Sequence, residues 1–169
     1  VVEAIRALPE LTLAVAGRRP PEQTWTSAKL QLGERIIHLG WLNRSDLADA
    51  IESSLLGLVT YKGTSAYMDE QASPTKLFEF AAAGLPVVGT PNPAVRNRVM
   101  DGNFGVLTAG THPEAIRSAI QEAASDEQQW KLWSHSGRRW AKSVGSWSRS
   151  EEKLLSLYAQ LLSKSCRDS

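Results

Sequence analysis

The chain has 169 residues, of which 42% are hydrophobic and 22% charged, and its formal net charge is +1. This size and composition suit one globular domain with a sizeable core. A net charge so close to zero argues, in bulk, for neither nucleic acid nor an anionic membrane as the partner, and the sequence shows neither an apolar run long enough to span a bilayer nor a signal peptide.

The cysteine and histidine content argues against disulfides and metal sites. Cys166 is the only cysteine, so no internal disulfide can form, and we expect a reducing, cytoplasmic setting. His38, His112 and His135 are the three histidines, and none has metal-ligand spacing with another histidine or with Cys166. We therefore predict no metal site.

The first part of the chain alternates helices with short apolar strands. Helices are predicted over residues 2–8 and 28–32, and a third is capped by Asn43 or Ser45 and runs through Ile51. The predicted strands are 11–16, ending at Gly17, 35–39, ending at Gly40, and 54–60.

A loop rich in Gly, Ser and Thr follows at residues 61–72. Beyond it the pattern predicts a helix from Ser73, a strand over 86–90, a helix over 93–100, a strand over 103–107, and helices over 112–124, 126–142 and 147–162.

Apolar strands separated by helices predict an α/β domain whose parallel sheet is covered by helices on both faces. Such sheets bind ligands beyond the carboxyl ends of their strands. The segments that lie at those ends are 17–19, 40–41, the loop with the helix from Ser73, and 90–93.

Residues 73–88 combine a helix start, a short helix, a glycine stop and a buried strand. Ser73 is a good N-cap and Pro74 suits the first helical position, while Gly84 is placed to end the helix. Lys76 is the exception, because a cation in the first helical turn opposes the helix dipole by about 0.3–1 kcal/mol. A helix start with a nearby lysine is a good place for phosphate.

Glu79 lies four residues after Thr75 and three after Lys76, so all three side chains share one helix face. Two interpretations are open at this point. The face can bind a ligand, or Lys76 and Glu79 can form a plain surface ion pair worth about 0.2–0.5 kcal/mol.

Four segments, 35–40, 73–88, 101–107 and 146–148, follow one another in an order that resembles the C-terminal domain of group 1 glycosyltransferases. The likeness covers nearly the whole chain. It implies a retaining enzyme with two Rossmann-like domains, the GT-B architecture, and a nucleoside diphosphate sugar in the cleft between them. This chain would be the Rossmann-like, three-layer α/β/α half that holds the nucleotide.

The resemblance also assigns roles to single residues. Glu79 falls on a family glutamate that binds the ribose hydroxyls, and Ser73, Thr75 and Lys76 fall on the segment that faces the diphosphate. The family has another glutamate eight residues before the position of Glu79. That position here is Gln71, which can hydrogen-bond the donor sugar but carries no carboxylate.

Gly17, Arg18 and Trp41 are weaker candidates for the donor sugar or the nucleotide, because they follow the first two strands. A solvated loop charge is the plainer interpretation of Arg18, and packing is the plainer one of Trp41. No residue is predicted to be the general base, so the catalytic residues stay unassigned.

The resemblance implies that residues 1–169 are a single donor-binding domain without its first strand, which would precede Val1, and without the N-terminal acceptor domain. We expect such a chain alone to bind a nucleotide sugar, to need no cofactor besides this substrate, and to be inactive. The full-length protein could be peripheral to a membrane. Two alternatives stay open: a nucleotide-sugar epimerase of the same architecture, and a non-catalytic nucleotide-binding or interaction domain.

The last predicted helix, 147–162, carries an apolar stripe made of Leu154, Leu155, Tyr158, Leu161 and Leu162. An exposed stripe of this kind favours association. We expect the helix to fold back on its own sheet near Trp130, Trp133 and Trp140, with weak dimerisation as the alternative.

Overall fold

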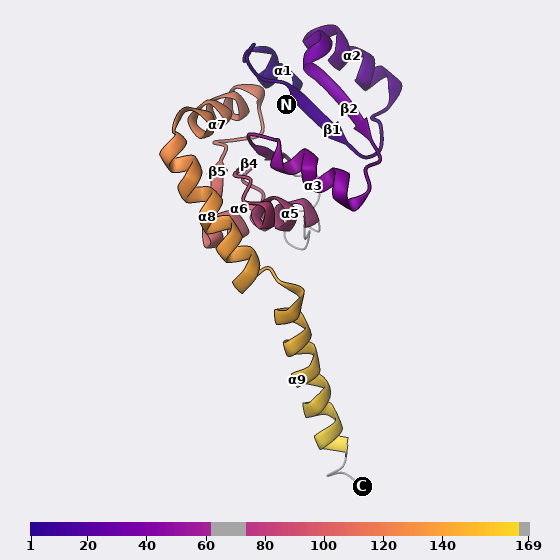
Figure 1. The fold of residues 1–169 in the computed structure, drawn as a ribbon, viewed down its shortest axis with the longest axis vertical. Helices are drawn as coiled ribbons and strands as arrows, with labels where there is room; N and C mark the ends of the chain where they lie inside the picture. The colour runs from indigo at the N-terminus through magenta and orange to yellow at the C-terminus, as the bar shows by residue number, and fades with distance from the viewer. Residues whose placement is uncertain (62–73, 166–169) are drawn as a thin grey trace.

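The computed structural model describes residues 1–61 and 74–165 (Figure 1). In chain order the elements are α1 (Val2–Arg6), β1 (Leu13–Ala16), α2 (Glu22–Leu32), the 3-10 turn η1 (Gly33–Arg35), β2 (Ile36–Gly40), α3 (Arg44–Glu52), β3 (Gly57–Val59), α5 (Thr75–Ala83), β4 (Val87–Gly89), α6 (Pro93–Gly102), β5 (Gly105–Leu107), α7 (Pro113–Ser125), α8 (Glu127–Ser143) and α9 (Trp147–Ser165). The predicted alternation of strands and helices is confirmed, although α2 is longer than predicted.

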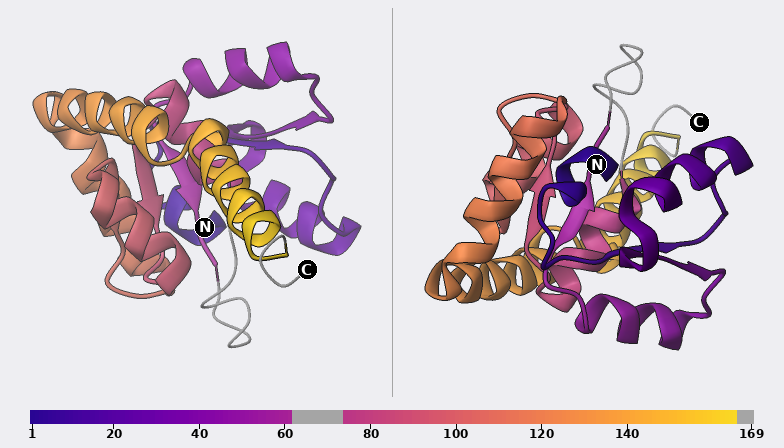
Figure 2. Two further views of the ribbon diagram at one scale, coloured as in Figure 1. Left: turned by 90° about the horizontal axis from the view of Figure 1, so that it is seen from below. Right: turned by 90° about the horizontal axis from the view of Figure 1, so that it is seen from above.

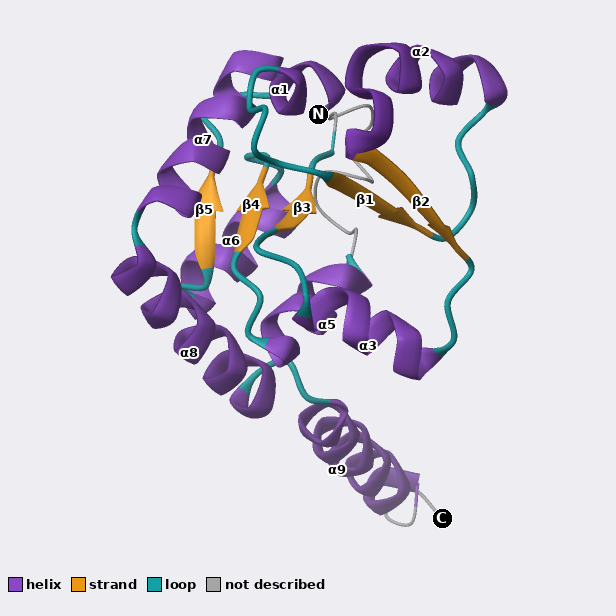
Figure 3. Ribbon diagram, turned by 45° about the horizontal axis from the view of Figure 1, so that its top comes forward, coloured by secondary structure: helices purple, strands orange, loops and turns teal. Residues whose placement is uncertain are grey.

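Every strand pair in the described part of the chain is parallel, as predicted. β1 pairs with β2, and β4 lies between β3 and β5. Figure 3 shows the two groups next to each other, with β3 on the side of β1. The described strands thus form two sheets, and no hydrogen-bonded ladder joins β1 to β3.

The three-stranded sheet is covered on both faces, as its apolar sequence predicts. The two neighbouring valines of β4 point to opposite faces, and both are 0% exposed. Val88 packs in a core with α1, α2 and α7, whereas Val87 packs in a second core with α5, α6 and Trp140 of α8. Helices on both sides of a parallel sheet make this part of the chain a Rossmann-like α/β/α domain.

The β1–β2 pair differs from the prediction, because only the face toward α2 is closely covered. Figure 2 shows α3 on the other side of these strands, but side chains on that face stay partly exposed. Leu13 and Val15 pack with the buried side of α2, but on β2 the residues that alternate with the packed ones, Ile37 and Leu39, are 46% and 37% exposed. An apolar strand sequence therefore did not guarantee two covered faces here.

Helix α5 is held from several sides. Leu77 and Ala81 on its inner face are 0% exposed. The ring of Phe80 lies so close to Gly57 of β3 that a Cβ there would overlap it. The helix ends, as predicted, at Gly84, which has a left-handed backbone with φ of 72°, and the Arg138 guanidinium of α8 donates to the carbonyl oxygen of Ala83 at 2.8 Å. These contacts fix both the direction and the end of α5.

The prediction that the last helix folds back on its own sheet is wrong. Figure 1 shows α9 leaving the rest of the chain and pointing away from it. Its stripe is open to solvent, from 41% at Leu154 to 69% at Leu162. The upstream tryptophans are already engaged: Trp133 and Trp140 are 7% and 6% exposed in the core, and the Trp130 indole N–H donates to the carbonyl oxygen of Leu55 at 2.8 Å.

None of the described helices is long and apolar enough to cross a membrane.

The turn at Gly84 predicts a graded response to alanine. A Cβ at Gly84 would meet Arg138 and Ser134, whereas one at Gly40, which has nearly the same φ of 71°, would meet no atom within 4 Å. We expect Gly40→Ala to lower the free energy of unfolding by about 1–2 kcal/mol, and Gly84→Ala to lower it by about 1–3 kcal/mol more. Urea unfolding measures both values. Equal losses would mean that α8 does not pack tightly on this turn.

Candidate functional site

Three of the predicted site residues, Thr75, Lys76 and Glu79, lie together at the start of α5. The helix follows β3 and precedes β4, so it begins at the carboxyl edge of the three-stranded parallel sheet. Ser73 and Gln71 lie outside the described residues. Pro74 occupies the N-cap position, and Thr75 is the first helical residue. The prediction of Pro74 as the first helical residue is therefore wrong by one position.

Pro74 has no side-chain acceptor, and α5 begins without a side-chain cap. The helices α1, α2 and α7 also begin without a side-chain cap, so the missing cap alone does not set α5 apart. At α3, α6 and α8, Asn43, Asn92 and Asp126 each accept a hydrogen bond from a backbone N–H of the helix they precede. Asn43 was one of the two predicted caps of α3. An uncapped helix start retains backbone N–H donors and the positive end of the dipole, both of which attract an anion.

Thr75, Lys76 and Glu79 lie on the exposed side of α5, as the helical spacing predicts. The opposite side carries Leu77 and Ala81, which are buried in the core. Burial of that side keeps the three polar side chains directed to solvent.

Lys76 does not form the surface ion pair that was the plainer interpretation. The ion pairs made by the described residues include neither Lys76 nor Glu79. The Lys76 ammonium instead lies 5.6 Å from the ring centroid of Tyr61, two residues after the end of β3. This cation–π contact stabilises the lysine by about 0.5–1 kcal/mol at an exposed site, and it leaves the Glu79 carboxylate open to solvent.

Tyr61 is held in place by Thr90, which begins the predicted carboxyl-end segment 90–93 but was given no role of its own. Thr90, at the end of β4, is 1% exposed. Its hydroxyl accepts a hydrogen bond from the Tyr61 backbone N–H at 2.9 Å and donates one to the Tyr61 carbonyl oxygen at 3.0 Å. The ends of β3 and β4 are therefore joined beside the start of α5. The sequence signal was that both residues lie in segments expected at the carboxyl ends of strands.

The weaker candidates lie at the carboxyl ends of β1 and β2. The Gly17 N–H donates to the Gly40 carbonyl oxygen at 2.7 Å, and His38 Nε2 lies 3.0 Å from the Gly17 carbonyl oxygen. Arg18 is exposed and Trp41 is 83% exposed, so the packing interpretation of Trp41 is wrong. The recorded hydrogen bonds and ring contacts of the described residues do not join this group to the start of α5.

The chemistry offered at the start of α5 is binding rather than proton transfer. Backbone N–H groups and an ammonium suit an anion such as phosphate, and a free carboxylate suits neighbouring hydroxyls. Within residues 1–61 and 74–165 no three His, Cys, Asp or Glu side chains gather in a way that could hold a metal ion.

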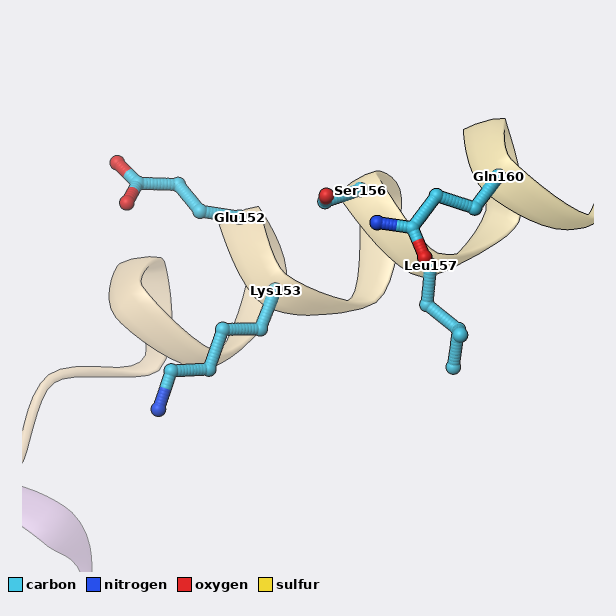
Figure 4. Close-up of a pocket in the computed structure, with 5 residues that line it drawn as sticks. All are labelled: Glu152, Lys153, Ser156, Leu157 and Gln160. Carbon is cyan, nitrogen blue, oxygen red and sulfur yellow. The ribbon is translucent and has the colours of Figure 1, made fainter.

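A hollow of about 410 Å³ lies elsewhere, on α9. It is lined by Glu152, Lys153, Ser156, Leu157 and Gln160, which all project from this one helix (Figure 4). All five are exposed. A ligand site needs polar groups that converge from several directions, and this hollow does not provide them.

Comparison with known proteins gives a family match and distant relatives. The family model described as "Glycosyl transferases group 1" matches residues 1–126. The GDP-mannose-dependent alpha-(1-6)-phosphatidylinositol monomannoside mannosyltransferase of Mycolicibacterium smegmatis is 25% identical over 162 residues, in an alignment that covers 90% of this chain and 42% of that protein. The chain therefore spans about two fifths of the length of this curated relative.

Two solved structures illustrate the similarity of fold. Anabaena HepE in complex with UDP superimposes with a TM-score of 0.77 at 17% identity, over 94% of this chain and 44% of that one. The C-terminal domain of a group 1 glycosyl transferase, LpcC of Francisella tularensis, gives a TM-score of 0.70 at 14% identity, over 86% of this chain and 77% of that one.

Proposed function

The chain belongs to the group 1 glycosyltransferases, and on that premise we propose that it is the domain that holds the donor of a sugar transferase. The donor is a nucleoside diphosphate sugar, and the reaction moves its glycosyl group to an acceptor. The donor is a substrate, and we propose no cofactor beside it.

One observation carries this proposal. At the uncapped start of α5, Lys76 and Glu79 share an exposed face and do not neutralise each other. The Lys76 ammonium lies instead beside Tyr61, at the carboxyl edge of the sheet. A parallel α/β sheet binds nucleotides at this edge.

The diphosphate is the part of the donor that we assign to the helix start. When the glycosyl group leaves, negative charge develops on the phosphate oxygens. Backbone N–H groups at Thr75 and Lys76, together with the Lys76 ammonium, would stabilise this charge because they are oriented before the reaction begins. Ser73 lies outside the described residues, and its hydroxyl stays a predicted contact of the same diphosphate.

The ribose is the part that we assign to Glu79. A carboxylate can accept two hydrogen bonds from a cis-diol, so it positions the donor without reacting with it. Glu79 lies one helical turn from Thr75 on an exposed face, which is about 5–6 Å along the helix. Gln71, Gly17, Arg18 and Trp41 stay predicted contacts of the sugar or the nucleotide.

The acceptor and the catalytic base belong, in this proposal, to a second domain. The described site offers no general base, so we expect the chain alone to be inactive. One observation supports an incomplete domain: no ladder joins β1 to β3, so the described strands form two separate sheets. A strand edge without a neighbour presents unpaired N–H and C=O groups. A reducing, cytoplasmic location remains a prediction from the single Cys166.

Titration calorimetry tests the assignment of the ribose and the diphosphate together. We expect the chain to bind UDP or GDP weakly, because half of the cleft is absent. Glu79→Ala should weaken nucleoside diphosphate binding about ten- to a hundredfold, the loss expected for one net hydrogen bond to a charged group. Binding of pyrophosphate should stay unchanged, since the phosphate contacts remain.

The matched control is Glu122→Ala, which removes an exposed glutamate from the middle of α7. It should leave the binding of every ligand as it is. An equal loss for UDP and pyrophosphate in Glu79→Ala would show that Glu79 acts through the helix rather than through ribose. No heat with UDP, GDP, ADP or pyrophosphate at about 1 mM would contradict nucleotide binding altogether.

We also propose that the chain associates weakly through α9. The stripe Leu154, Leu155, Tyr158, Leu161 and Leu162 is exposed along the helix, and such a surface favours contact with another apolar surface. Sedimentation velocity should show an average mass that rises with concentration up to roughly 0.1 mM. A chain that ends at Ser150 should sediment as a monomer throughout. An intact chain that stays monomeric would contradict self-association.

A further inference from the structure

Helix α8 has two chemically different sides. Its inner side packs against α5 and the core through Trp133, Ser134, Gly137 and Trp140, all of which are buried. The outer side is basic, and it carries Lys131, His135, Arg138, Arg139 and Lys142. Lys131, His135, Arg138 and Lys142 recur every three or four positions, Arg139 is next to Arg138, and all five are exposed, so they form one stripe along the helix. We call this stripe the basic face of α8, and Figure 3 shows α8 along the outside of the chain.

The basic face concentrates positive charge that the composition of the whole chain hides. α8 contains two lysines and two arginines against one carboxylate, Glu127. The excess on this one helix is thus larger than the formal net charge of +1 on all 169 residues. The near-neutral total does not exclude a local attraction to a negatively charged surface.

Most of these charges have no opposite charge beside them. Glu127 is paired with Lys131 at 2.6 Å, at the first turn of the helix. Arg138 donates to the carbonyl oxygen of Ala83. Among the described residues, neither Arg139 nor Lys142 forms an ion pair with a carboxylate. An unpaired cation keeps its full field for an outside partner.

The basic face of α8 continues into an apolar end. Beyond the last turn of α8 the surface becomes apolar and aromatic, since Val144 is 55% and Trp147 73% exposed. A basic stripe that ends in an exposed tryptophan is the combination found where proteins meet the headgroup layer of a membrane.

We infer that the basic face of α8 docks on the surface of a bilayer that contains anionic phospholipids. The cations of α8 attract the lipid phosphates, and Val144 and Trp147 lie in the headgroup layer at one end of the stripe. Nucleic acid is a poorer match, because the basic residues occupy one side of one helix and the rest of the chain is nearly neutral. This inference does not depend on the donor site at α5.

Sedimentation with vesicles tests the inference on the intact chain. We expect binding to vesicles of phosphatidylcholine with phosphatidylglycerol, and much weaker binding to phosphatidylcholine alone. Each basic residue near an anionic surface contributes about 1 kcal/mol, which is about fivefold in affinity. Arg139→Gln with Lys142→Gln should therefore weaken binding to anionic vesicles roughly 25-fold. Salt at about 0.5 M should weaken it as well.

The matched control is Arg6→Gln with Arg44→Gln, which removes two exposed arginines from α1 and α3. It should change vesicle binding less than about twofold, because these residues lie outside the basic face. Circular dichroism checks that both double variants keep the fold. Three outcomes would overturn the inference: equal binding to neutral and anionic vesicles, equal loss in both double variants, or tighter binding to a single-stranded oligonucleotide than to anionic vesicles.

Discussion

The close packing of α5 against α8 is the constraint on which the candidate donor site depends. Gly137 favours it, since a Cβ there would lie 3.3 Å from the carbonyl oxygen of Ala81 on α5, which is a tight contact. The Arg138 guanidinium then holds the carbonyl oxygen of Ala83, and Leu77 is buried on the inner side of α5. A rotation of α5 would break these contacts. The side chains on its outer side are therefore kept at the edge of the sheet.

Local patterns predicted the parts of the fold that depend on local chemistry. The alternation of apolar strands and helices, the cap of α3 and the left-handed stop at Gly84 were all visible in the sequence. What failed depends on tertiary neighbours. The open face of the β1–β2 pair and the position of α9 depend on which core surfaces other elements already cover. Tyr61 and Thr90 are 29 residues apart, and no periodicity connects two residues across such a distance.

The site was predicted only where it depends on local helix geometry. Thr75, Lys76 and Glu79 share a face because the helix repeat requires it. That Lys76 lies on the Tyr61 ring rather than beside Glu79 could be learned only from the structure. The two proposals meet at α8, whose inner side positions the donor site and whose outer side is basic. Docking of that outer side would therefore also set the orientation of the donor site relative to a membrane.

The central claim is that a nucleoside diphosphate binds at the start of α5. Nuclear magnetic resonance of the isotope-labelled chain, titrated with UDP and with GDP, tests it most directly. We expect the largest changes in amide chemical shift at Thr75 and Lys76, whose N–H groups would face the phosphates, and smaller ones at Glu79 and Tyr61. Unchanged Thr75 and Lys76 resonances, with the shifts confined to α8 or α9, would contradict the account.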